Sequence, residues 1–304
     1  MADRAASVLA RLRNQANLTG RTFQLCLQLF CQEEFLRRLA SSLYKNNFVL
    51  KGGHLIYCLT DFSSRPTVDI DFLARDTTNT TEALEGILAN IINTPTGNDF
   101  IAYEIMYIEQ ISIDKKFPGL SAVLEARIKN TKTPIKIDFG FGDIVYPEEQ
   151  TREVPTQLSD FALPIVNAYS LETIVAEKLD AILDLMEFSS RMKDYYDLYY
   201  LSLQFNFDGS LLRTALVRTF ANRERSYQSN DFLNLIAFAC NEDMQKKWDT
   251  FNKRLKLPPI HFDEVIAGIA AFLEPVMESI YADVSFGFYW HAQDRMWKET
   301  GNKT

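Results

Sequence analysis

The hydrophobic positions change their spacing along the first quarter of the chain. In "TFQLCLQLFCQEEFLRRLASSL" the large apolar residues lie on one helical stripe, so we expect two helices within residues 1–43. The next segment, "NFVLKGG", predicts a short strand that enters a glycine turn, and "HLIYCL" begins another helix. After a polar loop, "TVDIDFLAR" alternates with period two, which is typical of a strand with one solvent-facing side.

The remaining pattern divides the chain into two parts. "TTEALEGILANIIN" predicts a helix capped by threonine, and "YEIMYIEQISID", "LSAVLEARIK" and "TPIKIDFGFGD" predict strands. Beyond Pro155, helical spacing dominates in "YSLETIVAEKLDAILDL", "RMKDYYDLYYLSLQ", "GSLLRTALVRTFANR" and "FDEVIAGIAAFLEPVMESIYADV". We therefore expect an α+β chain, with a sheet domain and its N-terminal helices at 1–155 and a mostly helical domain at 156–304.

Composition narrows the class of protein. The 304 residues are 47% hydrophobic and carry a net charge of -8, which argues against a general nucleic-acid coat but leaves room for a local basic patch. Four scattered cysteines and three histidines have no metal-ligand spacing, so we expect a reduced intracellular protein without a zinc site. No apolar run resembles a signal peptide or a membrane span, and we expect a cytoplasmic protein without a membrane partner.

Two aspartates interrupt the strand pattern of "TVDIDFLA". Asp69 and Asp71 would point to one face of the strand, about 7 Å apart, while Val68, Ile70 and Phe72 would point to the core. Two carboxylates on one face repel each other unless a divalent cation neutralises them. The alternative is a strand with one solvated face and no ligand.

A glycine pair precedes these carboxylates. Gly52 and Gly53 follow a predicted strand and open a helix, so backbone N–H groups and the positive helix end can approach phosphate oxygens. Without a ligand the pair is only a tight strand-to-helix turn. A phosphate-binding turn followed by paired carboxylates is a stronger signal than either part alone.

A third carboxylate lies in the strand pattern of "IKIDFGFGD". The sheet could bring Asp138 next to Asp69 and Asp71, whereas Asp143 reads as a turn residue after Gly142. Three carboxylates around one or two magnesium ions can bind a nucleoside triphosphate and activate a hydroxyl for in-line attack.

Four motifs in order, "FVLKGGHLIY...RPTVDIDFLA", "IKIDFGFGD", "YSLETIVAEKLDAIL" and "SRMKDYYDLYYL", resemble the AbiEii/AbiGii toxin family of nucleotidyltransferases, which includes the MenT toxins. The resemblance covers roughly residues 45–202. It implies a nucleotidyltransferase fold of the polymerase beta type, a separate antitoxin, and Mg²⁺ or Mn²⁺ as cofactor. It also implies transfer of a nucleotide from a nucleoside triphosphate to RNA, at the 3′ acceptor end of tRNA, which blocks aminoacylation.

The resemblance also assigns residues. It makes Asp69, Asp71 and Asp138 the metal-binding carboxylates, Lys178 of "AEK" the essential lysine, and Asp194 the late essential aspartate, with Asp197 as the alternative. His54 stands where the family often has Ser or Thr, and the loop from Gly53 to Asp69 is longer than usual. The nucleotide-binding candidates are Lys51, Gly52, Gly53, His54, Arg65, Lys193 and Asp197.

The two late helical motifs can be interpreted as nucleotide-binding elements or as surface ion pairs. Lys178 lies on a helix whose apolar positions would hold it against the sheet domain, so its ammonium could reach a triphosphate oxygen. In "SRMKDYYDL", Arg191, Asp194 and Asp197 recur at i, i+3 and i+6, and Lys193 lies four residues before Asp197. Spacing alone favours surface ion pairs in both motifs.

Two basic clusters are candidates for contact with an acceptor RNA. Trp248 and Phe251 are interleaved with the second cluster and could stack on bases. A solvated helix face is the alternative for either cluster, and Trp290, Trp297, His261 and His291 read as structural. The clustered cations are Arg213, Arg218, Arg223 and Arg225, and then Lys246, Lys247, Lys253, Arg254 and Lys256.

Three functions remain open from the sequence. The first is a metal-dependent nucleotidyltransferase toxin acting on RNA. The second is a kinase or transferase that modifies a protein, for example its antitoxin, at the same triphosphate site, although "HRD" and "DFG" motifs are missing. The third is a binding protein without catalytic activity, which the presence of all three acids with Lys178 and Asp194 disfavours.

Overall fold

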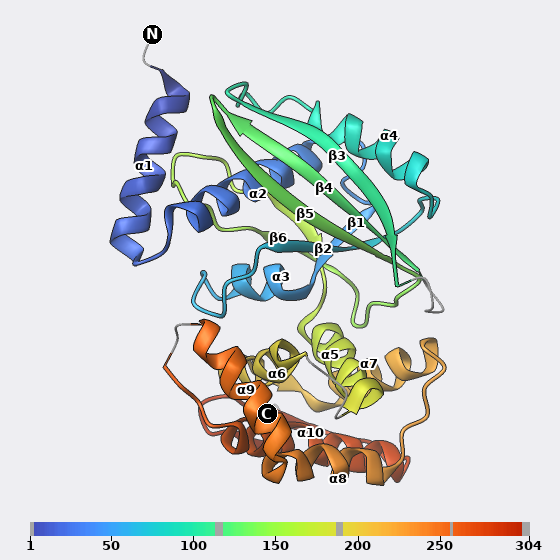
Figure 1. The fold of residues 1–304 in the computed structure, drawn as a ribbon. Coiled ribbons are helices and arrows are strands. Elements are labelled where there is room, and N and C mark those ends of the chain that lie inside the picture. Colours follow the sequence, from blue (N-terminus) through green and yellow to red (C-terminus); the bar gives the residue numbers. More distant parts are fainter. Residues whose placement is uncertain (1–2, 113–117, 187–190, 256–257, 300–304) are drawn as a thin grey trace, which may run out of the picture. The chain divides into compact units, whose positions relative to one another are not determined.

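A computed structural model describes residues 3–112, 118–186, 191–255 and 258–299 (Figure 1). The chain forms two compact units. Unit 1 comprises Met1–Asp143 and Glu149–Tyr169, and unit 2 comprises Ile144–Glu148 and Ser170–Thr304. Residues 156–169, which the hydrophobic pattern assigned to the helical half, belong to unit 1, because they complete its sheet.

Among its described residues, unit 1 has four helices, and local capping explains where three of them begin. The side chains of Asp3, Thr22 and Thr80 accept hydrogen bonds from backbone N–H groups in the first turns of α1, α2 and α4. The fourth, α3, follows β1 directly and lies against β1 and β2. The helices are α1 (Arg4–Thr19), α2 (Phe23–Ser41), α3 (Gly52–Leu59) and α4 (Thr81–Ile92).

Seven strands form one mixed sheet in the order β3-β4-β5-β2-β1-β7-β6. The pairs β2/β5 and β1/β7 are parallel, and the other neighbours are antiparallel. The two parallel pairs join segments far apart in the sequence. The strands are β1 (Phe48–Lys51), β2 (Asp69–Ala74), β3 (Ile101–Ile111), β4 (Gly119–Ile128), β5 (Thr131–Phe141), β6 (Gln150–Glu153) and β7 (Ile165–Ala168).

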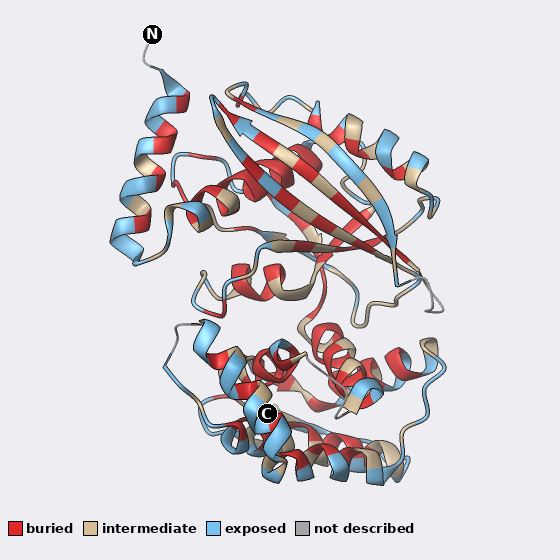
Figure 2. Ribbon diagram, in the orientation of Figure 1, coloured by how far each residue is buried: buried red, intermediate tan, exposed pale blue. Residues whose placement is uncertain are grey.

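One face of this sheet is the core of unit 1. Ile70 and Phe72 are fully buried, and Phe72 packs near Phe35 of α2, with the ring centroids 6.5 Å apart. In Figure 1, α2 passes behind the strands, and Figure 2 shows the inner strands largely buried while β3 is mainly exposed. The prediction that Val68 also points to the core was wrong: the residue is 46% exposed, because it precedes β2. Its carbonyl accepts hydrogen bonds from Gln28 and Gln32.

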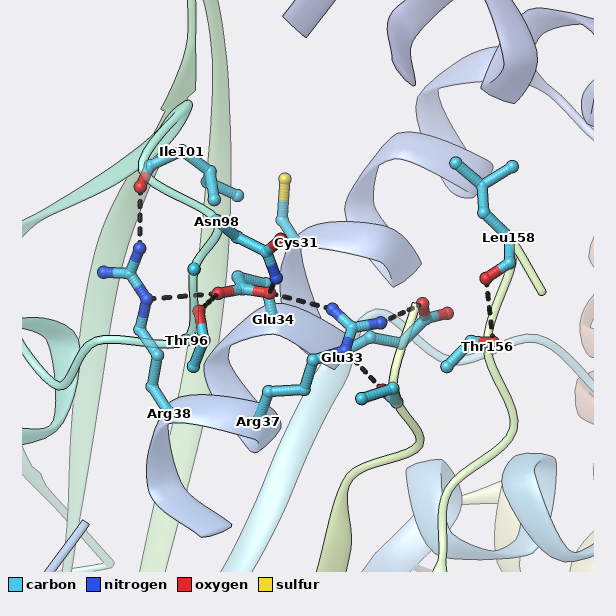
Figure 3. A network of polar contacts seen from close by, with 12 residues as sticks. Cys31, Glu33, Glu34, Arg37, Arg38, Thr96, Asn98, Ile101, Thr156 and Leu158 are labelled. Atoms are coloured by element: carbon cyan, nitrogen blue, oxygen red, sulfur yellow. Dashed lines mark hydrogen bonds and ion pairs between the residues drawn. The ribbon is translucent and has the colours of Figure 1, made fainter. Parts of the chain in front are cut away.

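A buried charge network anchors α2 to two loops (Figure 3). Glu34 accepts hydrogen bonds from Arg37 and, at 2.6 Å, from the amide of Asn98. Arg37 Nε donates to the carbonyl of Ala162 at 2.6 Å, and Arg38 Nη2 donates to the carbonyl of Ile101 at 2.7 Å. Because each buried charge has an opposite charge or a carbonyl beside it, the network holds the core-side helix of the sheet in place.

Unit 2 is mostly helical and carries a small sheet of order β10-β9-β8. Trp290 Nε1 donates to the carbonyl of Ser202, and Trp297 Nε1 donates to the carbonyl of Phe272, so both indoles are structural, as expected. Among the described residues, no helix is long and apolar enough to cross a membrane. The elements are α5 (Leu171–Leu185), α6 (Met192–Gln204), β8 (Phe207–Asp208), α7 (Gly209–Asn222), α8 (Ser229–Ala237), η2 (Phe238–Cys240), α9 (Glu242–Leu255), α10 (Phe262–Tyr281), β9 (Phe288–His291) and β10 (Met296–Glu299).

Candidate active site

The predicted glycine turn joins β1 to α3. Gly52 has a φ of +70°, a conformation that side chains disfavour, and a Cβ atom built on it would lie 2.1 Å from Asp71 Oδ2. A Cβ on Gly53 would lie 3.0 Å from Arg65 Nη2. Gly52 is therefore required for close packing, whereas a Cβ on Gly53 would only displace the end of the Arg65 side chain slightly. Both glycines open the N-terminus of α3, where backbone N–H groups lack helical partners.

The three predicted carboxylates lie in two neighbouring parallel strands. Asp71 of β2 is in register with Asp138 of β5, and Asp69 is in register with Lys136. Lys51 of β1 stands opposite Asp71 on the other side. Side chains in register on adjacent strands point to the same face, so these residues share the face opposite the buried Ile70 and Phe72.

Asp138 has two partners that the sequence reading did not include. Ser121 Oγ of β4 donates to Asp138 Oδ1 at 2.6 Å, and Lys136 Nζ donates to Asp138 Oδ2 at 3.0 Å. The contact between Lys136 and Asp138 could have been predicted from "IKID", since residues i and i+2 of a strand share a face. Ser121 could not be found from spacing, because it comes from another strand.

The charge of Lys136 lies among all three carboxylates. Burial lowers the pKa of its ammonium, but the hydrogen bond to Asp138 and the charges of Asp138, Asp69 and Asp71 outweigh burial and raise the pKa above its usual value. A cation at this face is therefore stabilised by the three aspartates together.

The residue types fit a divalent cation. Carboxylate oxygens are the ligands that Mg²⁺ and Mn²⁺ prefer, Gly52 leaves the Asp71 carboxylate uncovered by a Cβ, and Lys136 already places positive charge at the same face. Within the described ranges, no three His, Cys, Asp or Glu side chains are gathered tightly enough to hold a metal ion. The carboxylates are thus distributed along two strands rather than gathered around one point.

Lys51 and Asp143 form an ion pair near the glycine turn. Lys51 Nζ lies 2.9 Å from Asp143 Oδ2, both side chains are 14% exposed, and the ammonium also lies 5.3 Å from the ring centroid of Tyr169. Gly140 lies beside this pair, and a Cβ there would be in ordinary contact with Lys51 Nζ, at 3.4 Å. Asp143 is therefore more than the turn residue expected from the sequence.

His54 and Arg65, two of the predicted nucleotide-binding residues, are buried. His54 is 1% exposed, and within the described part of the chain neither ring nitrogen has a hydrogen-bond partner. Burial lowers the pKa of His54 to about 4, so the imidazole is neutral near pH 7. Arg65 is 9% exposed, and its guanidinium lies beside Gly53.

The late motifs form a separate cluster in unit 2. Lys178 Nζ of α5 lies 2.9 Å from Asp194 Oδ1 and 2.6 Å from Asp197 Oδ2, both on α6. Arg191 Nε lies 2.6 Å from Asp194 Oδ2, while Lys193 is exposed on the first turn of α6. Burial would raise the pKa of Asp194, but Lys178 and Arg191 lower it to about 2, so the carboxylate is ionised.

The first basic cluster of unit 2 is largely engaged within the protein. Arg223 pairs with Asp180 at 2.8 Å, Arg225 pairs with Asp184 at 2.7 Å, and Arg218 lies 4.2 Å from the ring centroid of Tyr146.

The second cluster loses its predicted stacking residue. The expectation that Trp248 could stack on an RNA base was wrong, because its side chain is fully buried and its indole N–H donates to the carbonyl of Ile260. Phe251 packs against Trp248, with the ring centroids 5.5 Å apart. Lys256 lies outside the described residues.

Comparison with known proteins identifies the family. The crystal structure of JHP933 from Helicobacter pylori matches with a TM-score of 0.51 and 15% identity over 86% of this chain and 95% of that chain. A second H. pylori structure, of a candidate nucleotidyltransferase, matches with a TM-score of 0.49 and 14% identity over 87% of this chain and 100% of that chain. No match was found among curated proteins.

A family model gives the decisive match. The model described as "Nucleotidyl transferase AbiEii toxin, Type IV TA system" matches residues 34–268. The predicted fold class, a nucleotidyltransferase sheet domain of the polymerase beta type followed by a mostly helical domain, is confirmed. Because the match extends over most of its length, the chain belongs to the AbiEii family of nucleotidyltransferase toxins of type IV toxin-antitoxin systems.

Proposed function

We propose that this protein is a metal-dependent toxin that transfers a nucleotide from a nucleoside triphosphate to RNA, at the 3′ acceptor end of tRNA. The single observation that supports this most strongly is that Asp71 is in register with Asp138 and lies directly beside Gly52 of the glycine turn. Asp69 lies two residues before Asp71, on the same face of β2. Extension of the acceptor end would prevent aminoacylation and so block translation.

The glycine turn is the proposed triphosphate site. The N-terminal N–H groups of α3, opened by Gly52 and Gly53, would donate hydrogen bonds to phosphate oxygens, and the helix end favours their negative charge. Lys51, at the last position of β1, would add a positive charge beside this turn. Because Gly52 has no Cβ, phosphate oxygens could approach the turn next to Asp71.

Asp69, Asp71 and Asp138 would hold one or two divalent cations, Mg²⁺ or Mn²⁺. When bound, such ions neutralise charge on the transferred phosphoryl group and on the leaving pyrophosphate. In the proposed transfer, the 3′ oxygen of the acceptor forms a bond to the α-phosphorus, and the bond from that phosphorus to the β-phosphate oxygen breaks. Asp138 would accept the proton of the attacking hydroxyl on Oδ2, while Ser121 Oγ donates a hydrogen bond to Oδ1.

The cluster of Lys178, Asp194 and Asp197 in unit 2 is the second part of the proposal. These side chains are almost completely buried, and the family resemblance assigns activity to them. A buried ammonium between two carboxylates is held in a fixed position. We propose that activity requires this cluster as well as the carboxylates of the sheet.

Labelled substrates test the proposal. Each of the four α-labelled nucleoside triphosphates is supplied in turn with Mg²⁺ and total tRNA, and the products are separated as RNA and protein. Label on the 3′ end of tRNA is expected, and sequencing of that end identifies the nucleotide. Label on this protein or on its antitoxin, with none on RNA, would instead indicate a transferase that modifies proteins.

A further inference from the structure

The face of the sheet that carries the carboxylates continues across β5 and β4 to the edge strand β3. Tyr107 is in register with Val123, Val123 with Lys136, and Lys136 with Asp69, so the four residues form one row across four strands. With neighbouring strands about 4.8 Å apart, Tyr107 is about 14 Å from Asp69 along the sheet. An aromatic ring therefore lies on the carboxylate face, at a distance from Asp69 that a short nucleotide chain can span.

A β-bulge sets the direction of this ring. The register of β3 against β4 shifts between Ile105 and Tyr107, leaving Met106 as the extra residue. Tyr103 before the shift donates to the carbonyl of Cys31 on the core side, and Tyr107 after it is 53% exposed. Without the shift, position 107 would share the core-facing side with 103 and 105.

The resulting surface includes exposed apolar side chains. Met106 is 52% exposed and Tyr107 53%, and Val123 between Tyr107 and Lys136 is partly exposed. Among the described residues, the Tyr107 ring stacks on no other aromatic ring and lies under no cation. We call Met106, Tyr107 and Val123 the edge platform.

The geometry of in-line phosphoryl transfer indicates which substrate would lie on the edge platform. In phosphoryl transfer the attacking and leaving oxygens lie on opposite sides of the phosphorus. In the sheet order β1-β2-β5-β4-β3, the proposed triphosphate turn follows β1, and the carboxylates lie on β2 and β5. The pyrophosphate would leave on the β1 side, so the attacking 3′ hydroxyl has to arrive from the β5 side, and its chain extends toward β4 and β3.

We infer that the edge platform binds the acceptor RNA, with a base near the 3′ end stacked on Tyr107. This inference rests on the proposed function and adds a positioning residue to it. Every base has a face that can stack, so the platform suits a single-stranded end without requiring a particular base.

The charges on the same face are consistent with stacking rather than phosphate binding. Arg127 pairs with Glu104 at 2.5 Å, and Lys132 pairs with Glu125 at 3.2 Å, so most cations near the platform are already neutralised. Glu109 in the next row is an exposed acid. The contribution of Tyr107 to RNA binding should therefore depend little on salt.

Binding of a fluorescein-labelled single-stranded RNA ending in CCA, measured by anisotropy with Mg²⁺ and without triphosphate, tests the inference separately from catalysis. Tyr107→Ala is expected to weaken binding about 5- to 150-fold, the range for loss of one stacked base. Tyr107→Phe keeps the ring and should bind within about twofold of wild type. Leu43→Ala, at another exposed apolar residue of unit 1, should bind like wild type.

Kinetics separate positioning from chemistry. In the transfer assay, Tyr107→Ala should raise the KM for RNA and leave the KM for triphosphate unchanged, with no change in melting temperature because the ring is exposed. Equal RNA binding by Tyr107→Ala and wild type would overturn the platform while leaving nucleotide transfer to RNA intact. If wild type neither binds the RNA nor labels it but labels a protein, the proposed function fails and the RNA platform is overturned with it.

Discussion

A Cβ atom on Gly52 would lie 2.1 Å from the carboxylate oxygen Oδ2 of Asp71. The turn that is proposed to hold phosphate and the strand that carries two of the carboxylates are therefore packed in direct contact. Gly52 also has a φ of +70°, so a substitution there meets both backbone strain and a collision.

We expect Gly52→Ala to abolish transfer and to lower the free energy of unfolding by about 1–3 kcal/mol, because the Asp71 carboxylate has to move and residue 52 is strained. Gly97→Ala is the matched control. Gly97 has a φ of +74° with nothing within 4 Å of the added Cβ, so this variant experiences the strain without the collision. Activity of Gly52→Ala close to that of Gly97→Ala would show that the contact with Asp71 has no functional importance.

Lys136→Met should lower the Mg²⁺ concentration needed for half-maximal transfer by about two- to fivefold. The ammonium is bonded to Asp138 and competes with a cation for the three carboxylates, and its 44% exposure keeps this effect small. Lys132→Met, on the same strand and paired with Glu125, should leave the Mg²⁺ dependence unchanged. Transfer by wild type, Lys136→Met and Lys132→Met is measured as a function of Mg²⁺ concentration. Identical curves for the three proteins would count against a cation site at this face.

Lys178→Met should lower the free energy of unfolding by about 3–5 kcal/mol, because Asp194 and Asp197, each 1% exposed, would lose the cation they share. The exposed neighbour gives a matched comparison: Lys193→Met should change stability by less than about 0.5 kcal/mol. Urea unfolding of both variants measures the difference.

Lys178→Arg tests whether the cluster acts in catalysis as well as in stability. Arginine keeps the charge but replaces a point-like ammonium by a planar group, so we expect transfer to fall at least about tenfold with a much smaller loss of stability. Full activity of this variant would assign Lys178 a structural role alone.

His54 should make unit 1 less stable as the pH falls. Its pKa is about 4 in the folded protein against 6.5 for the unfolded chain, so between these values the unfolded state binds a proton that the folded state does not. Stability from this group is complete above pH 6.5 and declines toward pH 4, by about 3 kcal/mol in all.

Nuclear magnetic resonance can measure this directly, since the chain has three histidines. One imidazole signal should titrate near pH 4, and it should vanish in His54→Leu, whose stability should also fall less between pH 6.5 and 4. His261→Asn, at an exposed histidine, should keep the low titration. A His54 signal that titrates near 6.5 would contradict the burial of His54.

The sequence predicted the longer elements of this fold well, because each has a clear periodicity over ten or more residues. The four-residue strand β1 was predicted because a glycine pair follows it, but two other short strands were missed. Strands β6 and β7 have four residues each and no glycine pair to mark them, and β7 joins the sheet beside β1 through a long-range parallel pairing. This is why residues 156–169 belong to the sheet unit.

The candidate site was partly visible in the sequence. The alternation around Asp69 and Asp71 predicted their shared face, and the glycine pair predicted the turn. The register that aligns Asp71 with Asp138 could not be read from one strand, and the pairing of Lys51 with Asp143 joins positions 92 residues apart. The complete burial of His54 depends on packing around α3, which no local pattern reports.

The most direct test of the central claim is the transfer of labelled nucleotide to total tRNA by Asp69→Asn, compared with wild type and with Asp76→Asn at an exposed loop position. The carboxylate site predicts that Asp69→Asn loses transfer by at least about a thousandfold with an unchanged melting temperature, while Asp76→Asn remains active. Transfer by a folded Asp69→Asn protein at the wild-type rate would contradict the account.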